Sequence, residues 1–193
     1  MPSAESTGPV YTIGHSTRTI EEFGALLSES AIRIVADVRS IPRSRRHPQF
    51  NIDVLPGSLS DRDVRYDHLA ALGGRRHRAR DAAPSPNTYW EHPAFRNYAD
   101  YAMTDSFKHG MAQLRELAAV GACAVMCSEA VWWRCHRRII SDYLLSEGFE
   151  VLHILGPNRT EAATLTPEAE QQPDGTLIYR GGSAAVQHTL FNE

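Results

Sequence analysis

A dense group of reactive side chains lies between residues 126 and 138, in the segment MCSEAVWWRCHRR. Its members are two thiols, a carboxylate, an imidazole and three guanidinium groups: Cys127, Cys135, Glu129, His136, Arg134, Arg137 and Arg138. The apolar run before it, 122–126, predicts a buried strand, and residues 139–144 after it predict a helix. Ligands of parallel α/β sheets bind at such strand-to-helix connections. The segment therefore predicts a functional site.

Polar residues also follow three other predicted strands. They are His15 and Ser16 after strand 10–13, Asp37, Arg39 and Ser40 at the end of strand 32–40, and Tyr66 and His68 at and just after the end of strand 64–66. None of these residues is needed by a hydrophobic core. Any one of these strand ends alone would be a weak signal, but four in one chain favour a common site.

Helical signals separate the strands. Thr19 and Glu22 have the spacing of a capping box, and Gly148 ends a helix predicted over 135–147. Strands that alternate with helices predict an α/β fold, specifically a Rossmann-like parallel sheet with helices on both faces, in three layers. Right-handed crossovers place the carboxyl ends of all parallel strands on one edge, so we expect the polar strand ends to share one rim.

Changes in composition divide the chain into three parts. Residues 1–9 predict a flexible N-terminal arm without the charged and apolar regions of a secretory signal. Residues 10–156 predict the α/β domain. Residues 157–193 are richer in Pro, Gln, Thr and Glu and predict a C-terminal extension or hairpin. Two arrangements stay open for this extension: it closes over the site, or it exchanges with a partner in a homodimer.

Composition also narrows the classes of function. No apolar run approaches the length of a membrane span, so we expect no membrane partner. An odd number of cysteines without a secretory signal favours reduced thiols and a cytoplasmic location. The net charge of −3 argues against indiscriminate binding to duplex nucleic acid. Residues 39–80 nevertheless hold ten arginines against four aspartates, and arginine grips phosphate or carboxylate at two points.

The order of these motifs resembles the domain-of-unknown-function 488 family. The resemblance runs from about residue 10 to residue 155. It rests on YTIGHS at 11–16, DVRSIP at 37–42 with Arg43 and Ser44, FN at 50–51, YDHL at 66–69, LGG at 72–74, CSE at 127–129 and CHR at 135–137. It implies an α/β domain in a branch that carries the C-x-E…C-H-R motif, and it implies no particular activity.

Six residues are candidates for the chemistry: Glu129, His15, Cys127, Cys135, His136 and Asp37. Cys135 lies near a predicted helix N-terminus between cationic residues, where the helix dipole and the charges lower a thiol pKa. An inert packed cysteine is the alternative. Glu129 beside Trp132 predicts a carboxyl group with a raised pKa suited to acid–base work, with ion pairing to an arginine as the alternative.

Nine further residues are candidates for substrate binding: Ser16, Arg39, Ser40, Arg43, Asn51, Gly73, Gly74, Arg75 and Arg137. The arginines supply charge, and the paired glycines allow the backbone to approach a phosphate closely. We expect Asp37 to act as the partner of Arg39 or as a base. A solvated charged surface is the alternative for the basic loop.

These assignments lead to three hypotheses. The first is an enzyme acting on a phosphate-bearing nucleotide or nucleic acid, by hydrolysis or transfer at an N-glycosidic bond with the Glu129 carboxylate stabilising positive charge. The second is a cysteine-based thiol enzyme or redox sensor, and the third is a non-catalytic nucleotide- or nucleic-acid-binding module. We expect no metal and no cofactor, because the spacing of Cys127 and Cys135 matches no zinc finger or ribbon and arginines oppose a cation.

Overall fold

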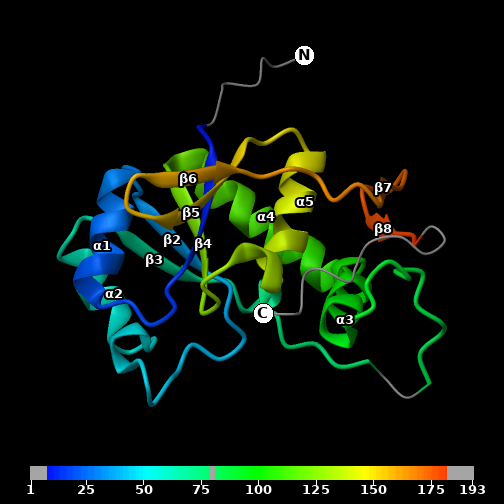
Figure 1. The fold of residues 1–193 in the computed structure, drawn as a ribbon, viewed down its shortest axis with the longest axis horizontal. Helices are drawn as coiled ribbons and strands as arrows, with labels where there is room; N and C mark the ends of the chain where they lie inside the picture. Colours follow the sequence, from blue (N-terminus) through cyan, green and yellow to red (C-terminus); the bar gives the residue numbers. More distant parts are fainter. Residues whose placement is uncertain (1–7, 79–80, 182–193) are drawn as a thin grey trace.

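Strands and helices alternate along most of the chain in the computed structural model, which describes residues 8–78 and 81–181 (Figure 1). The strands are β1 (Val10–Gly14), β2 (Ile34–Asp37), β3 (Arg65–His68), β4 (Cys123–Cys127), β5 (Val151–Gly156), β6 (Arg159–Ala162), β7 (Ala169–Gln171) and β8 (Leu177–Tyr179). The helices are α1 (Ile20–Glu29), α2 (Leu55–Ser60), α3 (Pro93–Ala102), α4 (Asp105–Val120) and α5 (Arg137–Ser146). None of these helices is long and apolar enough to cross a membrane.

Six strands form the main sheet, in the order β3-β2-β4-β1-β5-β6. Strands β1 to β5 pair in parallel, which confirms the predicted α/β fold. Strand β6 pairs antiparallel with β5, so the sheet is mixed rather than purely parallel. The two strands are joined by a turn in which Asn158 has a φ of 52°, and such a short connection can join only antiparallel neighbours.

Helices cover both faces of the sheet, as predicted. Within the sheet, Val35 faces the hydrophobic cluster formed with α1 and α2, whereas its neighbours Ile34 and Ala36 face the cluster formed with α4 and α5. In Figure 1 the helices α1 and α2 accordingly lie apart from α4 and α5, with the sheet between them. The capping box between Thr19 and Glu22 is present at the start of α1.

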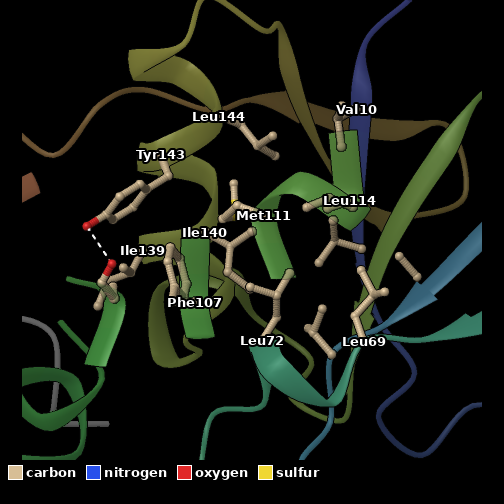
Figure 2. Packing of buried hydrophobic residues seen from close by; sticks show 14 of the residues in the cluster. Val10, Leu69, Leu72, Phe107, Met111, Leu114, Ile139, Ile140, Tyr143 and Leu144 are labelled. Carbon is tan, nitrogen blue, oxygen red and sulfur yellow. Dashed lines mark hydrogen bonds between the residues drawn. The ribbon is translucent and has the colours of Figure 1, made fainter. Parts of the chain in front are cut away.

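The larger core lies under α4 and α5. Phe107, Met111 and Leu114 form the apolar stripe that the sequence predicted, and all three are almost fully buried. Figure 2 shows these side chains packed against Ile139, Ile140 and Leu144 of α5. The hydroxyl of Tyr143 donates a hydrogen bond to the carbonyl oxygen of Ala102 at 3.0 Å, drawn as the dashed line, and links α5 to the end of α3.

Strands β7 and β8 form a small antiparallel sheet that packs on this core. Leu177 and Tyr179 are buried in it, and the Tyr179 hydroxyl donates to Asp142 Oδ2 at 3.0 Å. The strand predicted at 176–179 is therefore β8. Residues 1–7 of the predicted N-terminal arm and residues 182–193 of the predicted extension lie outside the described residues.

Candidate functional site

A cavity of about 630 Å³ lies at the carboxyl edge of the parallel strands. The segments that follow β1, β2, β3 and β4 all contribute to its lining, together with the start of α3. Eleven of the fifteen predicted site residues line it: His15, Ser16, Arg39, Ser40, Arg43, Gly74, Arg75, Cys127, Glu129, Cys135 and His136. The other four, Asp37, Asn51, Gly73 and Arg137, do not.

Two cysteines form the floor of the cavity. Cys127 ends β4 and Cys135 lies two residues before the start of α5, and their Sγ atoms are 2.8 Å apart. Only 1% of Cys127 and 3% of Cys135 is exposed. The backbone N–H of Glu129 donates to Cys127 Sγ at 3.3 Å, and that of Arg137 donates to Cys135 Sγ at 3.5 Å. The helix N-terminus and the loop thus hold the two sulfurs in contact.

The two thiols have opposite pKa shifts. Burial, and then the neighbouring Cys135, raise the pKa of Cys127 well above its usual range. Burial also disfavours a thiolate at Cys135, but the hydrogen bond with Cys127 and the nearby His136 and Arg137 outweigh it and lower the pKa of Cys135 well below its usual range. The surroundings therefore favour a thiolate at Cys135 over one at Cys127.

The ring of His136 is fixed beside Cys135. Its Nε2 lies 2.9 Å from the carbonyl oxygen of Val38 and must donate to it, so Nδ1 is the nitrogen that faces Cys135 Sγ, at 3.4 Å. Gly74 packs directly on the ring: a Cβ atom at that position would lie 2.4 Å from Nδ1. The ring of Tyr98 contacts the imidazole edge-on, at 5.0 Å between centroids.

A second buried network joins the ends of β1 and β2. Arg39 binds the Asp37 carboxylate through Nε and Nη2, with a shortest distance of 2.6 Å, and Nη2 also donates to the Phe50 carbonyl at 2.7 Å. Its Nη1 donates to His15 Nε2 at 3.2 Å. Because an arginine only donates, His15 Nε2 must be the acceptor, and Nδ1–H donates to the Ser16 carbonyl at 2.9 Å.

His15 is consequently held neutral. Burial, and then the positive charge of Arg39, lower its pKa to about 4. Its ring also stacks on Phe50, with 4.2 Å between centroids. Both nitrogens are occupied, so His15 orients Arg39 in this structure and offers no free lone pair for proton transfer.

The predicted residues that do not line the cavity lie directly behind it. Asp37 is completely buried and accepts a further hydrogen bond from the Tyr66 hydroxyl at 2.7 Å. Asn51 Oδ1 accepts from the backbone N–H of Ser44 at 2.6 Å and shapes the loop after β2. Gly73 packs on Ser40, where a Cβ atom would lie 2.6 Å from the hydroxyl oxygen.

Arg137 is the largest fully buried side chain among the predicted residues. It is 1% exposed and points beneath the loop after β4. Its Nη2 donates to the Glu129 carbonyl at 2.7 Å and its Nη1 to Thr12 Oγ1 at 3.3 Å. Thr12 in turn contacts His153 Nδ1 at 2.7 Å, and Trp132 stacks on the His153 ring. Trp132 is half-buried and covers this layer from one side.

Glu129 contributes its main chain to the fold and leaves its side chain in solvent. A Cβ atom at Gly14 would lie 1.7 Å from the Glu129 carbonyl oxygen, so only glycine permits this approach. The carboxylate is exposed, and it makes no hydrogen bond or ion pair with any residue that the structure describes. The partly apolar environment that the sequence suggested for this carboxylate is absent.

Arginines give the cavity its positive charge. Arg75 is exposed, and its backbone N–H donates to Ser40 Oγ at 2.9 Å. Arg43 is also exposed and has a long contact of 3.4 Å with Asp53. Arg39 also lines the cavity. Its Nη1 carries two N–H groups, of which one donates to His15 and the other makes no hydrogen bond to a described residue. These groups can bind a phosphate or a carboxylate.

Sequence reasoning missed several lining residues, among them Ser44, His47, Phe95 and Tyr98. Phe95 and Tyr98 enter from α3, which follows the long segment 77–92 and carries no cysteine or histidine to draw attention to it. No group of three or more His, Cys, Asp and Glu side chains within 8–78 and 81–181 is arranged to hold a metal ion.

Comparison with known proteins gives one match. The family model described as Domain of unknown function DUF488 matches residues 19–144. No curated protein and no solved structure matches the chain. The matched span contains the loop after β2, the turn at Gly73 and Gly74, and both cysteines of the cavity floor. On the strength of that span, more than half of its length, the chain belongs to the DUF488 family, as its motifs predicted.

Proposed function

We propose that this protein is a thiol-dependent oxidoreductase in which Cys135 is the nucleophile and Cys127 the resolving thiol. The contact that carries the proposal is the 2.8 Å separation of the two Sγ atoms on the floor of a cationic cavity. A thiolate attacks more readily than a thiol, and Cys135 has the thiolate-stabilising neighbours. A second thiol in contact with the first can complete a two-electron exchange without moving the backbone far.

The reaction is a thiol–disulfide exchange. The Cys135 thiolate attacks one sulfur of a substrate disulfide, a mixed disulfide forms, and the other substrate sulfur leaves as a thiolate. Cys127 then loses its proton to that leaving thiolate and attacks Cys135 Sγ, which releases the second half of the substrate. The substrate gains two electrons and the protein is left with a Cys127–Cys135 disulfide.

The substrate is a small molecule with an anionic group. Both cysteines are almost fully buried, so a disulfide on the surface of a folded protein is too large to reach them. A cavity of about 630 Å³ accepts a ligand of ordinary small-molecule size. Arg39, Arg43 and Arg75 favour a phosphate or carboxylate on that molecule. Reduced thiols of this kind suit a cytoplasmic location.

Alkylation kinetics test the proposal. We expect iodoacetamide to modify Cys135 much faster at pH 6 than Cys123, whose pKa burial raises to about 12. In Cys127→Ser, oxidised glutathione should leave a stable mixed disulfide on Cys135, whereas the wild-type protein should lose two thiols and form the Cys127–Cys135 bond. Equal, slow alkylation of all three cysteines and no internal disulfide would overturn the proposal.

The N-glycosidic reaction is a second candidate, favoured by the position of the Glu129 carboxylate on the rim with Arg43 and Arg75. Once a nucleotide or nucleic-acid substrate is found, the variant Glu129→Gln distinguishes the N-glycosidic reaction from the thiol exchange. Full turnover by this variant rules out the carboxylate mechanism. Lost turnover with an unchanged rate of Cys135 alkylation supports it. Salt-dependent nucleotide binding that survives loss of Glu129 and both cysteines would instead favour a non-catalytic binding module.

A further inference from the structure

Arg137 is a buried cation without a carboxylate partner. It is 1% exposed, and it forms no ion pair with any Asp or Glu among the described residues. Its side-chain hydrogen bonds go to the Glu129 carbonyl oxygen and the Thr12 hydroxyl, both of which are neutral. Its Nε is buried and has no hydrogen-bond partner within 8–78 and 81–181. An uncompensated buried charge is strongly destabilising, so this cation requires an anion nearby.

The groups that surround Arg137 and the sulfurs offer one such anion. The described titratable groups that interact with them are Arg18 beyond β1, Tyr98 of α3, Cys127 of β4, Cys135, His136 and His153 of β5. Two of these are thiols, and the rest are cationic, neutral or phenolic. The backbone N–H of Arg137 already donates to Cys135 Sγ. A thiolate at Cys135 is therefore the available counter-charge.

We propose that Arg137 is a positioning residue that holds Cys135 as a thiolate and thereby raises the reduction potential of the Cys127–Cys135 disulfide above the value it would have without this cation. This inference rests on the reactive thiol pair proposed above. Forming the disulfide removes the thiolate and leaves Arg137 buried without an anion, whereas reduction restores the pair. Stabilisation of the reduced form raises the reduction potential of a disulfide.

The proton balance gives this idea a measurable signature. With Cys127 as a thiol and Cys135 as a thiolate, oxidation by oxidised glutathione takes up one proton from solvent and yields the protein disulfide and two glutathione thiols. The equilibrium constant then falls tenfold for each unit that the pH rises, about 30 mV for this two-electron couple. Arginine keeps its proton throughout.

Other sources of the counter-charge predict a different result. If a protonated His136 were the partner of the thiolate, its proton would pass to glutathione on oxidation, and the equilibrium would not depend on pH. Two neutral thiols would also give a flat profile. The pH dependence therefore distinguishes Arg137 from His136 as the group that balances Cys135.

The test is equilibration of the purified full-length protein with glutathione redox buffers between pH 5.5 and 7.5, followed by acid quenching and mass analysis of the oxidised fraction. We expect the tenfold dependence in the wild-type protein and in Arg137→Lys. In Arg137→Gln we expect at least tenfold more oxidised protein at pH 7 and a flattened profile. Arg138→Gln is the matched control, because Arg138 lies one residue further on, over the Trp90 ring, and should behave as wild type.

Two outcomes separate the possible failures. A Cys127–Cys135 disulfide that forms with an equilibrium independent of pH in the wild-type protein overturns the role of Arg137 and leaves the thiol reaction standing. This measurement needs no variant, so it decides the matter even if Arg137→Gln fails to fold. A chain that forms no internal disulfide at any glutathione ratio overturns the proposed function itself.

Discussion

The substitution Asp37→Asn should destabilise the protein strongly, because Asp37 is the buried counter-ion of Arg39. Its carboxylate accepts hydrogen bonds from the backbone N–H, Nε and Nη2 of Arg39 and from the Tyr66 hydroxyl, at 2.6–3.1 Å. The exposed fractions of the Asp37 and Arg39 side chains are 0% and 7%. Breaking a buried ion pair by removing one partner costs about 3–5 kcal/mol.

This cost would consume a large part of the stability of a domain, which is about 5–15 kcal/mol in total. We expect urea unfolding, followed by tryptophan fluorescence under reducing conditions, to show a lower midpoint with little change in slope. The double variant Asp37→Asn/Arg39→Met should recover part of the loss, since it leaves no unpaired cation.

An exposed ion pair provides the control for this prediction. Arg43 and Asp53 are 3.4 Å apart with side chains 63% and 56% exposed, so Asp53→Asn should change the free energy of unfolding by less than about 1 kcal/mol. If Asp37→Asn costs no more than this control, the assignment of Asp37 as a structural counter-ion is wrong. If Asp37→Asn keeps the stability of the wild-type protein but loses the proposed enzymatic activity, the result would instead support a role of Asp37 as a base.

Two further predictions concern the rim and its buried histidines. Gly14→Ala should destabilise the protein by roughly 3 kcal/mol and slow Cys135 alkylation, because the new methyl displaces the Glu129 carbonyl to which Arg137 donates. Gly57→Ala is the control for urea unfolding. A Cβ atom at Gly57 would meet nothing within 4 Å, so this variant should be as stable as the wild-type protein. Burial lowers the pKa of His15 and of His153 to about 4, so the unfolded chain binds the extra protons and stability should fall between pH 6.5 and 4, by roughly 2 kcal/mol for each histidine from pH 7 to 5. The measurement is urea unfolding at a series of pH values in a Cys135→Ser background, which removes the contribution of the thiolate. In that background His153→Gln should remove about half of the dependence of the free energy of unfolding on pH. An unchanged dependence would contradict the assignment of His153 as a buried neutral histidine.

Local signals in the sequence predicted most of the elements that position the site. The capping box at Thr19 and Glu22 defines the start of α1, and the spacing of Phe107, Met111 and Leu114 predicts the buried face of α4. Right-handed crossovers then place the ends of β1 to β4 on one edge without any knowledge of side-chain contacts. Strand β6 escaped prediction because all four of its residues are exposed and show no alternation.

Contacts between distant loops could not be predicted in the same way. The segment 128–134 has to fold back before Cys127 and Cys135 can touch, and no periodic pattern describes that return. Arg137 was expected to bind substrate because of its charge, yet the first turn of α5 directs it beneath the loop toward Thr12. The charge of a residue can be read from the sequence, but the direction of its side chain depends on the packing of several elements.

The glycines of the site show why those contacts matter for reactivity. The sequence suggested that Gly73 and Gly74 make room for a phosphate, but each makes room for another part of the protein: Gly73 for Ser40 and Gly74 for the His136 ring. Gly14 does the same for the Glu129 carbonyl, which in turn holds Arg137. The loops after β1, β2, β3 and β4 are therefore locked to one another by close backbone approaches that a side chain would prevent. Because His136 and Arg137 lie beside Cys135, the reactivity proposed for this thiol depends on the close packing at Gly14 and Gly74 as well as on the groups that contact the sulfur.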